Sequence, residues 1–369
     1  MKKIFLILLV CWLISFMPGS AQENFWTQNP QDSSYWVKQT SGVTEALNAV
    51  FFADENHGCA VGEKGVIITT EDGGAHWVKQ NSTTDLPLYG VYFKTAELGW
   101  TVGDQGVLLC TRDGGKTWIS GRTDTKEPLY GVYFLTPEKG WVSGGKLGIL
   151  AASASLFQLA ANSHKNSSVL LATENGGANW RLVENPLKQD IQSVYFLNDK
   201  IGWAAGAQGD TIVTFDGGKT WEKRPTKVDK QLFDIVFTDE KTGWAVGGRY
   251  RYLNNGMFGR DLQMRWAILL KTTDGGLSWE KVNINQGDSP AKGIFNRIFM
   301  FENLGWLGGF RQAQTNLFFT SDRGTSWEEI TIEPFIRDSF FVKPNLGWLV
   351  GDNGTILCFK PQLNESSNK

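Results

Sequence analysis

The sequence is poor in the residues from which many metal and catalytic sites are built. Its 369 residues include 3 His and 4 Cys, and no two Cys are spaced as C-x-x-C. So few ligands argue against a zinc site, and we expect neither a metal nor a cofactor. Lys and Arg total 36 against 38 Asp and Glu, and no run of basic residues occurs. We therefore expect no nucleic-acid partner.

Long hydrophobic runs are absent after the first 21 residues. There, two Lys precede an apolar segment over residues 4–16, and a Gly-Ser-Ala sequence ends at residue 21. A basic, an apolar and a small-residue segment in this order are typical of a cleaved signal peptide. Residues 1–21 therefore predict export, to the periplasm or the medium, and we expect no membrane-spanning segment afterwards.

Trp and Gly, by contrast, are abundant, with 16 and 42 residues. Gly followed by Trp, or once by Cys, recurs at intervals of 41, 41, 62, 41, 62 and 42 residues. A period of about 41 residues is typical of propeller blades. Four short β-rich runs in each unit, separated by turn residues, predict a four-stranded antiparallel sheet. The units are marked by Gly58, Gly99, Gly140, Gly202, Gly243, Gly305 and Gly347.

A second motif, Thr-x-Asp-Gly-Gly-x-x-Trp, lies between the third and fourth runs of six units. A short acidic or amide side chain can bind the following backbone amides, Gly permits positive φ, and Trp can turn into the core. The motif therefore predicts a structural hairpin clamp. Its residues are Asp72, Asp113, Asn175, Asp216, Asp274 and Asp322, with Trp77, Trp118, Trp180, Trp221, Trp279 and Trp327.

This motif resembles the Asp-box, or bacterial neuraminidase (BNR) repeat. Together with the Val-Tyr-Phe and Gly-Trp-x-Val-Gly runs over residues 36–360, it resembles the propeller family of photosystem II stability and assembly factors. The resemblance implies an all-β, seven-bladed β-propeller of four-stranded antiparallel blades. It also implies a role in assembling a photosystem-like complex. Asp-boxes occur in sialidases, xyloglucanases and sortilin-type receptors as well, so the box alone does not select a function.

The seventh unit lacks a box and a fourth run. The missing strand is found at the other end of the chain, since residues 35–39 match residues 76–80, one repeat later. We expect the N-terminal strand to complete the last blade and close the ring. Residues 22–360 then form a single propeller, and residues 361–369 form a polar tail.

Insertions lengthen three units at equivalent places. They cover residues 144–168 in the third unit, 247–266 in the fifth and, more briefly, 308–316 in the sixth. All fall between the second and third strands, so we expect them on the face with the inter-blade linkers, opposite the box hairpins. We call these the insertion-bearing face and the box-bearing face. The third-unit insertion is apolar and could form an amphipathic helix. Loops on a rigid scaffold concentrate binding residues.

The fifth-unit insertion combines Arg with Tyr. One hypothesis is a cationic, aromatic patch for a carboxylate, a glycan or an acidic protein surface. The alternative is a solvated loop whose Arg side chains pair with local acids. The candidate residues are Arg249, Tyr250, Arg251, Tyr252, Arg260 and Arg265, which Arg297, Arg311 and Arg337 could extend.

A second candidate site lies on the first strand of each unit, which we expect to be innermost. The small position before Val-Tyr-Phe becomes polar in the later units. Asp234, Asn296, Arg297, Arg337 and Asp338 could form one polar sector, or a hydrated lining of the channel. The position is expected to hold Ala49, Gly90, Gly131, Ser193, Asp234, Asn296 and Asp338 in turn.

Catalysis has little support in the sequence. No Arg occurs between residue 22 and Arg112, where a sialidase would need one, and xyloglucanases use paired carboxylates between two propellers. No Ser-His or Cys-His arrangement occurs. Cys59, Cys110 and Cys358 occupy core strand positions and are expected to be buried thiols, with a disulfide as the alternative.

We therefore expect an exported, monomeric, non-catalytic scaffold. It would bind a protein or another macromolecule on the insertion-bearing face, as an assembly or stability factor for an envelope complex. The alternative is a carbohydrate-binding or glycoside-hydrolase-like propeller, for which Asp234 and Asp338 are the candidate acids.

Overall fold

The computed structural model describes residues 35–145, 168–254, 260–284, 293–311, 314–333 and 335–361. Within these ranges the chain forms β-strands and short 3₁₀ turns, and no α-helix. No helix in this part is long and apolar enough to cross a membrane. The expected signal segment, the inserted residues 146–167 and the tail from residue 362 lie outside the described ranges. The all-β class is confirmed.

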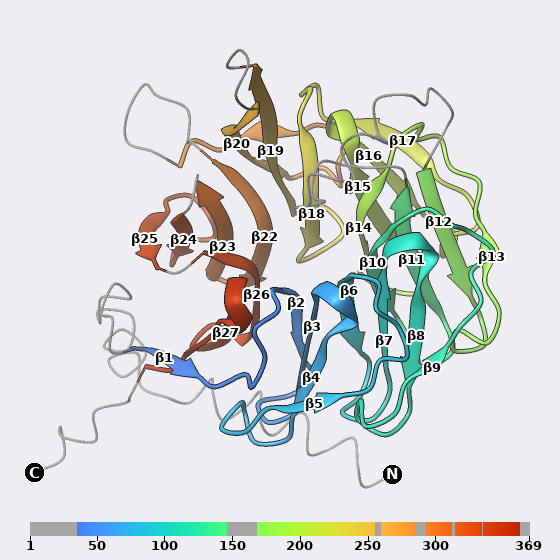
Figure 1. The fold of residues 1–369 in the computed structure, drawn as a ribbon. Coiled ribbons are helices and arrows are strands. Elements are labelled where there is room, and N and C mark those ends of the chain that lie inside the picture. Colours follow the sequence, from blue (N-terminus) through green and yellow to red (C-terminus); the bar gives the residue numbers. More distant parts are fainter. Residues whose placement is uncertain are drawn as a thin grey trace, which may run out of the picture.

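The described strands form seven four-stranded antiparallel units, which we call blades 1 to 7 (Figure 1). Blade 1 contains β2 (Leu47–Phe52), β3 (Gly58–Gly62), β4 (Ile67–Thr70) and β5 (Val78–Gln80); blade 2 contains β6 (Leu88–Phe93), β7 (Gly99–Gly103), β8 (Leu108–Thr111) and β9 (Ile119–Ser120); blade 3 contains β10 (Leu129–Phe134), β11 (Gly140–Gly145), β12 (Ser168–Thr173) and β13 (Arg181–Leu182). Blade 4 contains β14 (Ile191–Phe196), β15 (Gly202–Gly206), β16 (Asp210–Thr214) and β17 (Glu222–Pro225); blade 5 contains β18 (Gln231–Phe237), β19 (Gly243–Asn254), β20 (Arg260–Thr272) and β21 (Glu280–Lys281). Blade 6 contains β22 (Ile294–Phe301), β23 (Leu304–Arg311), β24 (Gln314–Thr320) and β25 (Glu328–Ile332); blade 7 contains β26 (Ile336–Lys343), β27 (Leu346–Gly351), β28 (Ile356–Phe359) and β1 (Trp36–Gln39).

The blades form a closed ring. Their first strands contact one another in chain order around the centre, and β26 of blade 7 contacts β2 of blade 1 (Figure 1). β1 pairs with β28, with Val37 opposite Cys358, so the N-terminal strand completes the last blade as the sequence predicts. Trp36 of this strand packs on Phe359 and Trp306. Blades 5 and 6 also pair directly, with Gly248 opposite Ile294.

Aromatic stacks join neighbouring blades. The Trp of the second strand lies flat on the Phe at the end of the next blade's first strand, as in Trp203 on Phe237, where the ring centroids are 3.6 Å apart. The box Trp of that next blade, here Trp279, meets the same Phe edge-on at 6.0 Å. The repeated Trp residues are therefore mainly core. Blade 1 breaks this pattern, because Cys59 replaces its second-strand Trp.

The box hairpins form the predicted clamp. In blade 4 the Asp216 carboxylate accepts hydrogen bonds from the backbone N–H of Thr220 at 2.9 Å and from its hydroxyl at 2.6 Å. Thr214 Oγ1 donates to Asp216 and accepts the N–H of Gly218. Gly217 and Gly218 have φ of 72° and 82°, which glycine adopts without strain. The hydrogen bonds to the backbone recur in the other five boxes, including that of Asn175.

The three cysteines in the described part of the chain are free thiols, so no disulfide links them. Cys59 and Cys358 are buried in the core, and Cys110 is partly buried. Burial raises the pKa of the Cys358 thiol to about 11, which keeps it protonated at neutral pH. These thiols are packing residues.

The two faces of the ring are arranged as the sequence predicts. The turn between the second and third strands contacts the inter-blade linker, since the Glu63 N–H donates to the carbonyl of Ala46 at 2.9 Å. The box hairpin meets the loop between the first and second strands on the other face, where Gly73 N–H donates to the carbonyl of Asn56. In four blades the second-to-third turn is a 3₁₀ turn, namely η2 (Glu63–Gly65), η3 (Asp104–Gly106), η4 (Ala207–Gly209) and η6 (Asp352–Gly354).

The fifth-unit insertion is a β-hairpin rather than an irregular loop. β19 and β20 continue past the blade and pair from Arg249 opposite Arg265 to Asn254 opposite Arg260. The alternating polar and apolar residues of this segment fit an extended strand, which the sequence reading missed. In blade 6 a shorter extension pairs Arg311 with Gln314. A helix in the third-unit insertion would fall outside the described residues.

Candidate binding face around the ring axis

Every first strand contains a bulge near its start. In blade 1 the pairing shifts between Leu47 and Ala49, which leaves Asn48 without a partner in the register. A bulge redirects side chains, and here it falls at the insertion-bearing end of the innermost strand. We call the seven bulged residues the axial residues: Asn48, Tyr89, Tyr130, Gln192, Phe233, Asn296 and Arg337.

The bulge corrects one sequence-based alignment. In blade 6 the residue that directly follows the bulge is Arg297, which lies opposite Gly308. The sequence alignment placed Asn296 at this position. The physical reason is that Met300, opposite Gly305, occupies the place of the strand-ending Phe, so the repeat is displaced by one residue. In blades 5, 6 and 7 this position is therefore occupied by Asp234, Arg297 and Asp338, an arginine between two carboxylates.

These three residues form one charged sector across blades 5 to 7, in which Asp338 is buried and Asp234 and Arg297 are half-buried. Arg297 Nε donates to Asp338 Oδ1 at 2.6 Å, and its Nη2 donates to Oδ2 at 3.3 Å. Burial alone would lower the pKa of Arg297, but Asp338 and Asp234 raise it, so the guanidinium keeps its charge. Burial raises the pKa of Asp234, and Arg297 opposes this. Of the five residues that the sequence grouped as one polar sector, these three lie together.

Both carboxylates are also fixed by protein donors. Asp234 Oδ1 accepts the Ser193 hydroxyl at 2.9 Å and the N–H of Ile235, and its Oδ2 accepts the N–H of Ile298 at 3.2 Å. Asp338 Oδ2 accepts the N–H of Val50. Each Asp thus joins its own blade to the first strand of the next blade. The two carboxylates therefore stabilise the contacts between neighbouring first strands.

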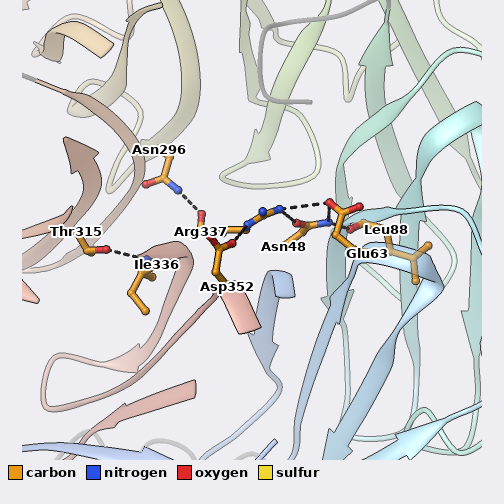
Figure 2. A network of polar contacts seen from close by, with 8 residues as sticks. All are labelled: Asn48, Glu63, Leu88, Asn296, Thr315, Ile336, Arg337 and Asp352. Atoms are coloured by element: carbon orange, nitrogen blue, oxygen red, sulfur yellow. Dashed lines mark hydrogen bonds and ion pairs between the residues drawn. The ribbon is translucent and has the colours of Figure 1, made fainter. Parts of the chain in front are cut away.

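Arg337 lies apart from this sector, in a network on the insertion-bearing face (Figure 2). Its Nε donates to Asp352 at 2.6 Å, and its Nη1 donates to Asn48 at 2.8 Å and to Glu63 at 3.3 Å. The side chain extends between η6 of blade 7 and the start of blade 1, as Figure 2 shows. Arg297 and Arg337 are therefore both paired with carboxylates of this chain.

The remaining predicted arginines and tyrosines lie on the extended strands of blades 5 and 6. Arg249, Tyr250, Arg251 and Tyr252 lie on β19, and Arg260 and Arg265 lie on β20, opposite them in the hairpin register. Arg311 ends β23. The side chains of all seven fall outside the described part of the structure, so a shared patch stays a prediction.

Sequence reading missed the acidic and aromatic part of this face. Tyr89 and Tyr130 are axial residues of blades 2 and 3, with ring centroids 5.8 Å apart. Asp104 begins η3 beside them, and Asp190 accepts hydrogen bonds from the amides of Gln192 and Gln231. The x-x-Gly turn after the second strand of blades 1, 2, 4 and 7, which begins with an acid in blades 1, 2 and 7, was the available signal. Within the described residues no cluster of His, Cys, Asp and Glu suited to a metal ion occurs.

Comparisons with known proteins agree with this architecture. Residues 28–131 and 172–248 match a family model described as photosynthesis system II assembly factor YCF48. A solved structure of YCF48 bound to D1 peptide shares 18% identity, covers 90% of this chain and 96% of that chain, and gives a TM-score of 0.65. YCF48 from Cyanidioschyzon merolae shares 18% identity, covers 88% of this chain and 99% of that chain, and gives a TM-score of 0.64. A search of curated proteins finds no match.

Glycoside-hydrolase propellers are also similar in fold. The GH74 xyloglucanase from Xanthomonas campestris shares 12% identity over 89% of this chain, with a TM-score of 0.63. This chain covers 54% of that enzyme, so it spans about half its length. At such identities the structural likeness concerns the fold alone.

Proposed function

Since this chain belongs to the YCF48-like family of β-propellers, we propose that it is an exported, non-catalytic scaffold that binds a polypeptide partner on its insertion-bearing face. One observation carries the proposal. The solved relative that covers nearly the same length is a complex with a peptide, so a propeller of this size and repeat pattern can hold a polypeptide. The role we infer is that of an assembly or stability factor for an envelope complex.

The choice of face rests on the distribution of side chains that depart from the repeat. The box-bearing face repeats the same clamp six times, and its Asp side chains are occupied by the following amides. The insertion-bearing face carries the extended hairpin of blade 5 and seven axial residues of five types. Variable groups on a rigid scaffold are suited to specific recognition.

The non-catalytic part of the proposal rests on Asp234 and Asp338. A hydrolytic acid or nucleophile needs an oxygen that can reach the substrate. Both oxygens of each carboxylate already accept hydrogen bonds from groups of this chain. The carbohydrate-binding alternative is favoured by the GH74 likeness in fold, and Arg and Tyr on the blade-5 hairpin would suit a glycan.

Partner capture from the native envelope tests the proposal. The full chain should recover one polypeptide in a fixed ratio, and the Arg249→Ala plus Arg251→Ala variant should recover less. A matched control removes two cations from the box-bearing face, as Arg112→Ala plus Lys116→Ala, and should capture as much as the unmodified chain. Recovery of no polypeptide, or equal loss in both variants, would count against the proposal, and retention on a xyloglucan matrix would favour the alternative.

A further inference from the structure

Blade 2 repeats a relationship seen in blade 7 with different side chains. In blade 7 the turn η6 begins with Asp352, whose carboxylate accepts Nε of the axial residue Arg337 at 2.6 Å. In blade 2 the turn η3 begins with Asp104, and the axial residue is Tyr89. Both turns have the same backbone, with the first N–H bound to the inter-blade linker. Asp104 thus occupies the place of Asp352 without an arginine beside it.

Asp104 has a carboxylate without a partner. The residue is 8% exposed, and among the residues that the structure describes none donates a hydrogen bond to its side chain or forms an ion pair with it. The corresponding acids in blades 7 and 1 are both satisfied, Asp352 by Arg337 and Glu63 by Arg337 and Asn48.

Two tyrosines border this carboxylate. Tyr89 and Tyr130 lie with their ring centroids 5.8 Å apart, and η3 contacts β10, the strand that carries Tyr130. Burial raises the pKa of both tyrosines, and the negative charge of Asp104 adds to the rise in each. Neither hydroxyl is hydrogen bonded to a residue in the described ranges. The Asp104 residue and the rings of Tyr89 and Tyr130 therefore lie in one part of the insertion-bearing face.

The charge in this part of the face is negative. Glu63 also acts on Tyr89, and Asp190 and Glu127 act on Tyr130. Arg337, the cation of the network in Figure 2, is shared between Asp352 and Glu63. A cation placed beside Asp104 would gain charge-assisted hydrogen bonds from the carboxylate and cation–π attraction from the tyrosine rings.

We propose that Asp104, Tyr89 and Tyr130 bind a guanidinium group, supplied by an arginine side chain of the partner polypeptide, as Asp352 binds Arg337 within the chain. The proposal deepens the proposed function and rests on it for the source of the arginine. It specifies a recognition element separate from the blade-5 hairpin. A guanidinium fits better than an ammonium because its planar donors can reach a carboxylate and two phenols together.

The test uses the full chain and a blocked pentapeptide with one arginine between Gly and Ser residues. Ligand-observed NMR measures its dissociation constant, and the same peptide with citrulline, which has the same shape without the charge, is the reference. We expect arginine-dependent binding that weakens about tenfold in Asp104→Asn and about threefold in Tyr89→Phe. Glu97→Gln removes a charge from the other face of blade 2 and should leave the dissociation constant unchanged.

Equal binding of the arginine and citrulline peptides, or unchanged binding in a folded Asp104→Asn protein, would overturn the inference. If Asp104→Asn fails to fold, unchanged binding of the arginine peptide to a folded Tyr89→Phe protein would overturn the inference instead. Partner capture separates this inference from the proposed function. A partner captured equally by the unmodified chain and Asp104→Asn leaves the proposed function standing and refutes the arginine site. Specific peptide binding without any captured partner supports the site and refutes the scaffold role.

Discussion

The carboxylate of Asp338 accepts a hydrogen bond from the backbone N–H of Val50 at 3.1 Å, across 288 residues of sequence. The contact joins blade 7 to blade 1 at the ring axis, inward of the strand pairing between β1 and β28. The propeller is therefore closed at two radii, by a strand pair at its outer edge and by a charged sector near its centre.

The inner closure predicts strong coupling between Asp338 and Arg297. Asp338→Asn leaves the Arg297 guanidinium without its carboxylate, and because 34% of the Arg297 side chain is exposed we expect a loss of about 2 to 3 kcal/mol in unfolding free energy. Adding Arg297→Met should cost little more, so that the double-mutant cycle gives a coupling of about 1 kcal/mol or more. Urea unfolding measures the three variants. Additive losses would show that the pair does not act as a unit.

The outer closure predicts that removing residues 22–40 lowers the melting temperature by at least about 5 °C, since it deletes β1 and the Trp36 packing on Trp306 and Phe359. It also exposes the edge of β28, which favours aggregation. Val37→Thr, an exposed position on the same strand, should melt like the unmodified chain. A truncated protein that melts at the same temperature and stays monomeric would disprove this account of closure.

The Asp-boxes predict acid sensitivity with a defined sign. The Thr220 hydroxyl and backbone N–H lower the pKa of Asp216 to about 2 from an ordinary value of 3.8. A lowered pKa stabilises the fold above the unfolded value, and this contribution is lost as pH falls from about 4 toward 2. Unfolding free energy measured over this range should fall less steeply in Asp216→Asn.

Blade 3 supplies the matched control for this prediction. Asn175 accepts the same backbone N–H, that of Asn179 at 2.9 Å, but does not titrate. Asn175→Asp should therefore add acid sensitivity, while Asp216→Asn removes it. Identical pH profiles for the unmodified chain and both variants would mean that the box carboxylates do not contribute through their charge.

The occupied oxygens of Asp234 and Asp338 predict that xyloglucan oligosaccharides are not hydrolysed. Reducing-end release over many hours, with a GH74 enzyme as the positive control, measures this. Turnover that disappears in Asp234→Asn, in a variant with an unchanged melting temperature, would reverse the non-catalytic proposal.

The repeat period made much of the fold predictable from sequence, because Gly-Trp runs and boxes repeat the local backbone directly. Blade architecture, closure by residues 35–39 and the assignment of faces follow from that repetition. Blade 6 was displaced by one residue because Met300 there replaces an aromatic marker. The blade-5 hairpin was missed because it interrupts the period.

The acidic and aromatic part of the face was missed for a different reason. Bulges and 3₁₀ turns decide where Tyr89, Asp104 and Arg337 point, and the Gly-Trp runs and boxes that mark the repeat do not indicate these directions. The bulge direction also separates Arg297, which pairs with Asp338, from Arg337, which pairs with Asp352. Arg297 and Arg337, which the sequence grouped in one candidate site, thus belong to different networks.

Site-specific photo-crosslinking in the native envelope tests the central claim most directly. A photoreactive residue replaces Lys126, exposed in the linker on the insertion-bearing face, or Lys116, exposed in the box of blade 2 on the other face. We predict one discrete polypeptide product from position 126 and none from position 116. A product from position 116 alone, or equal products from both positions, would contradict the assignment of the binding face.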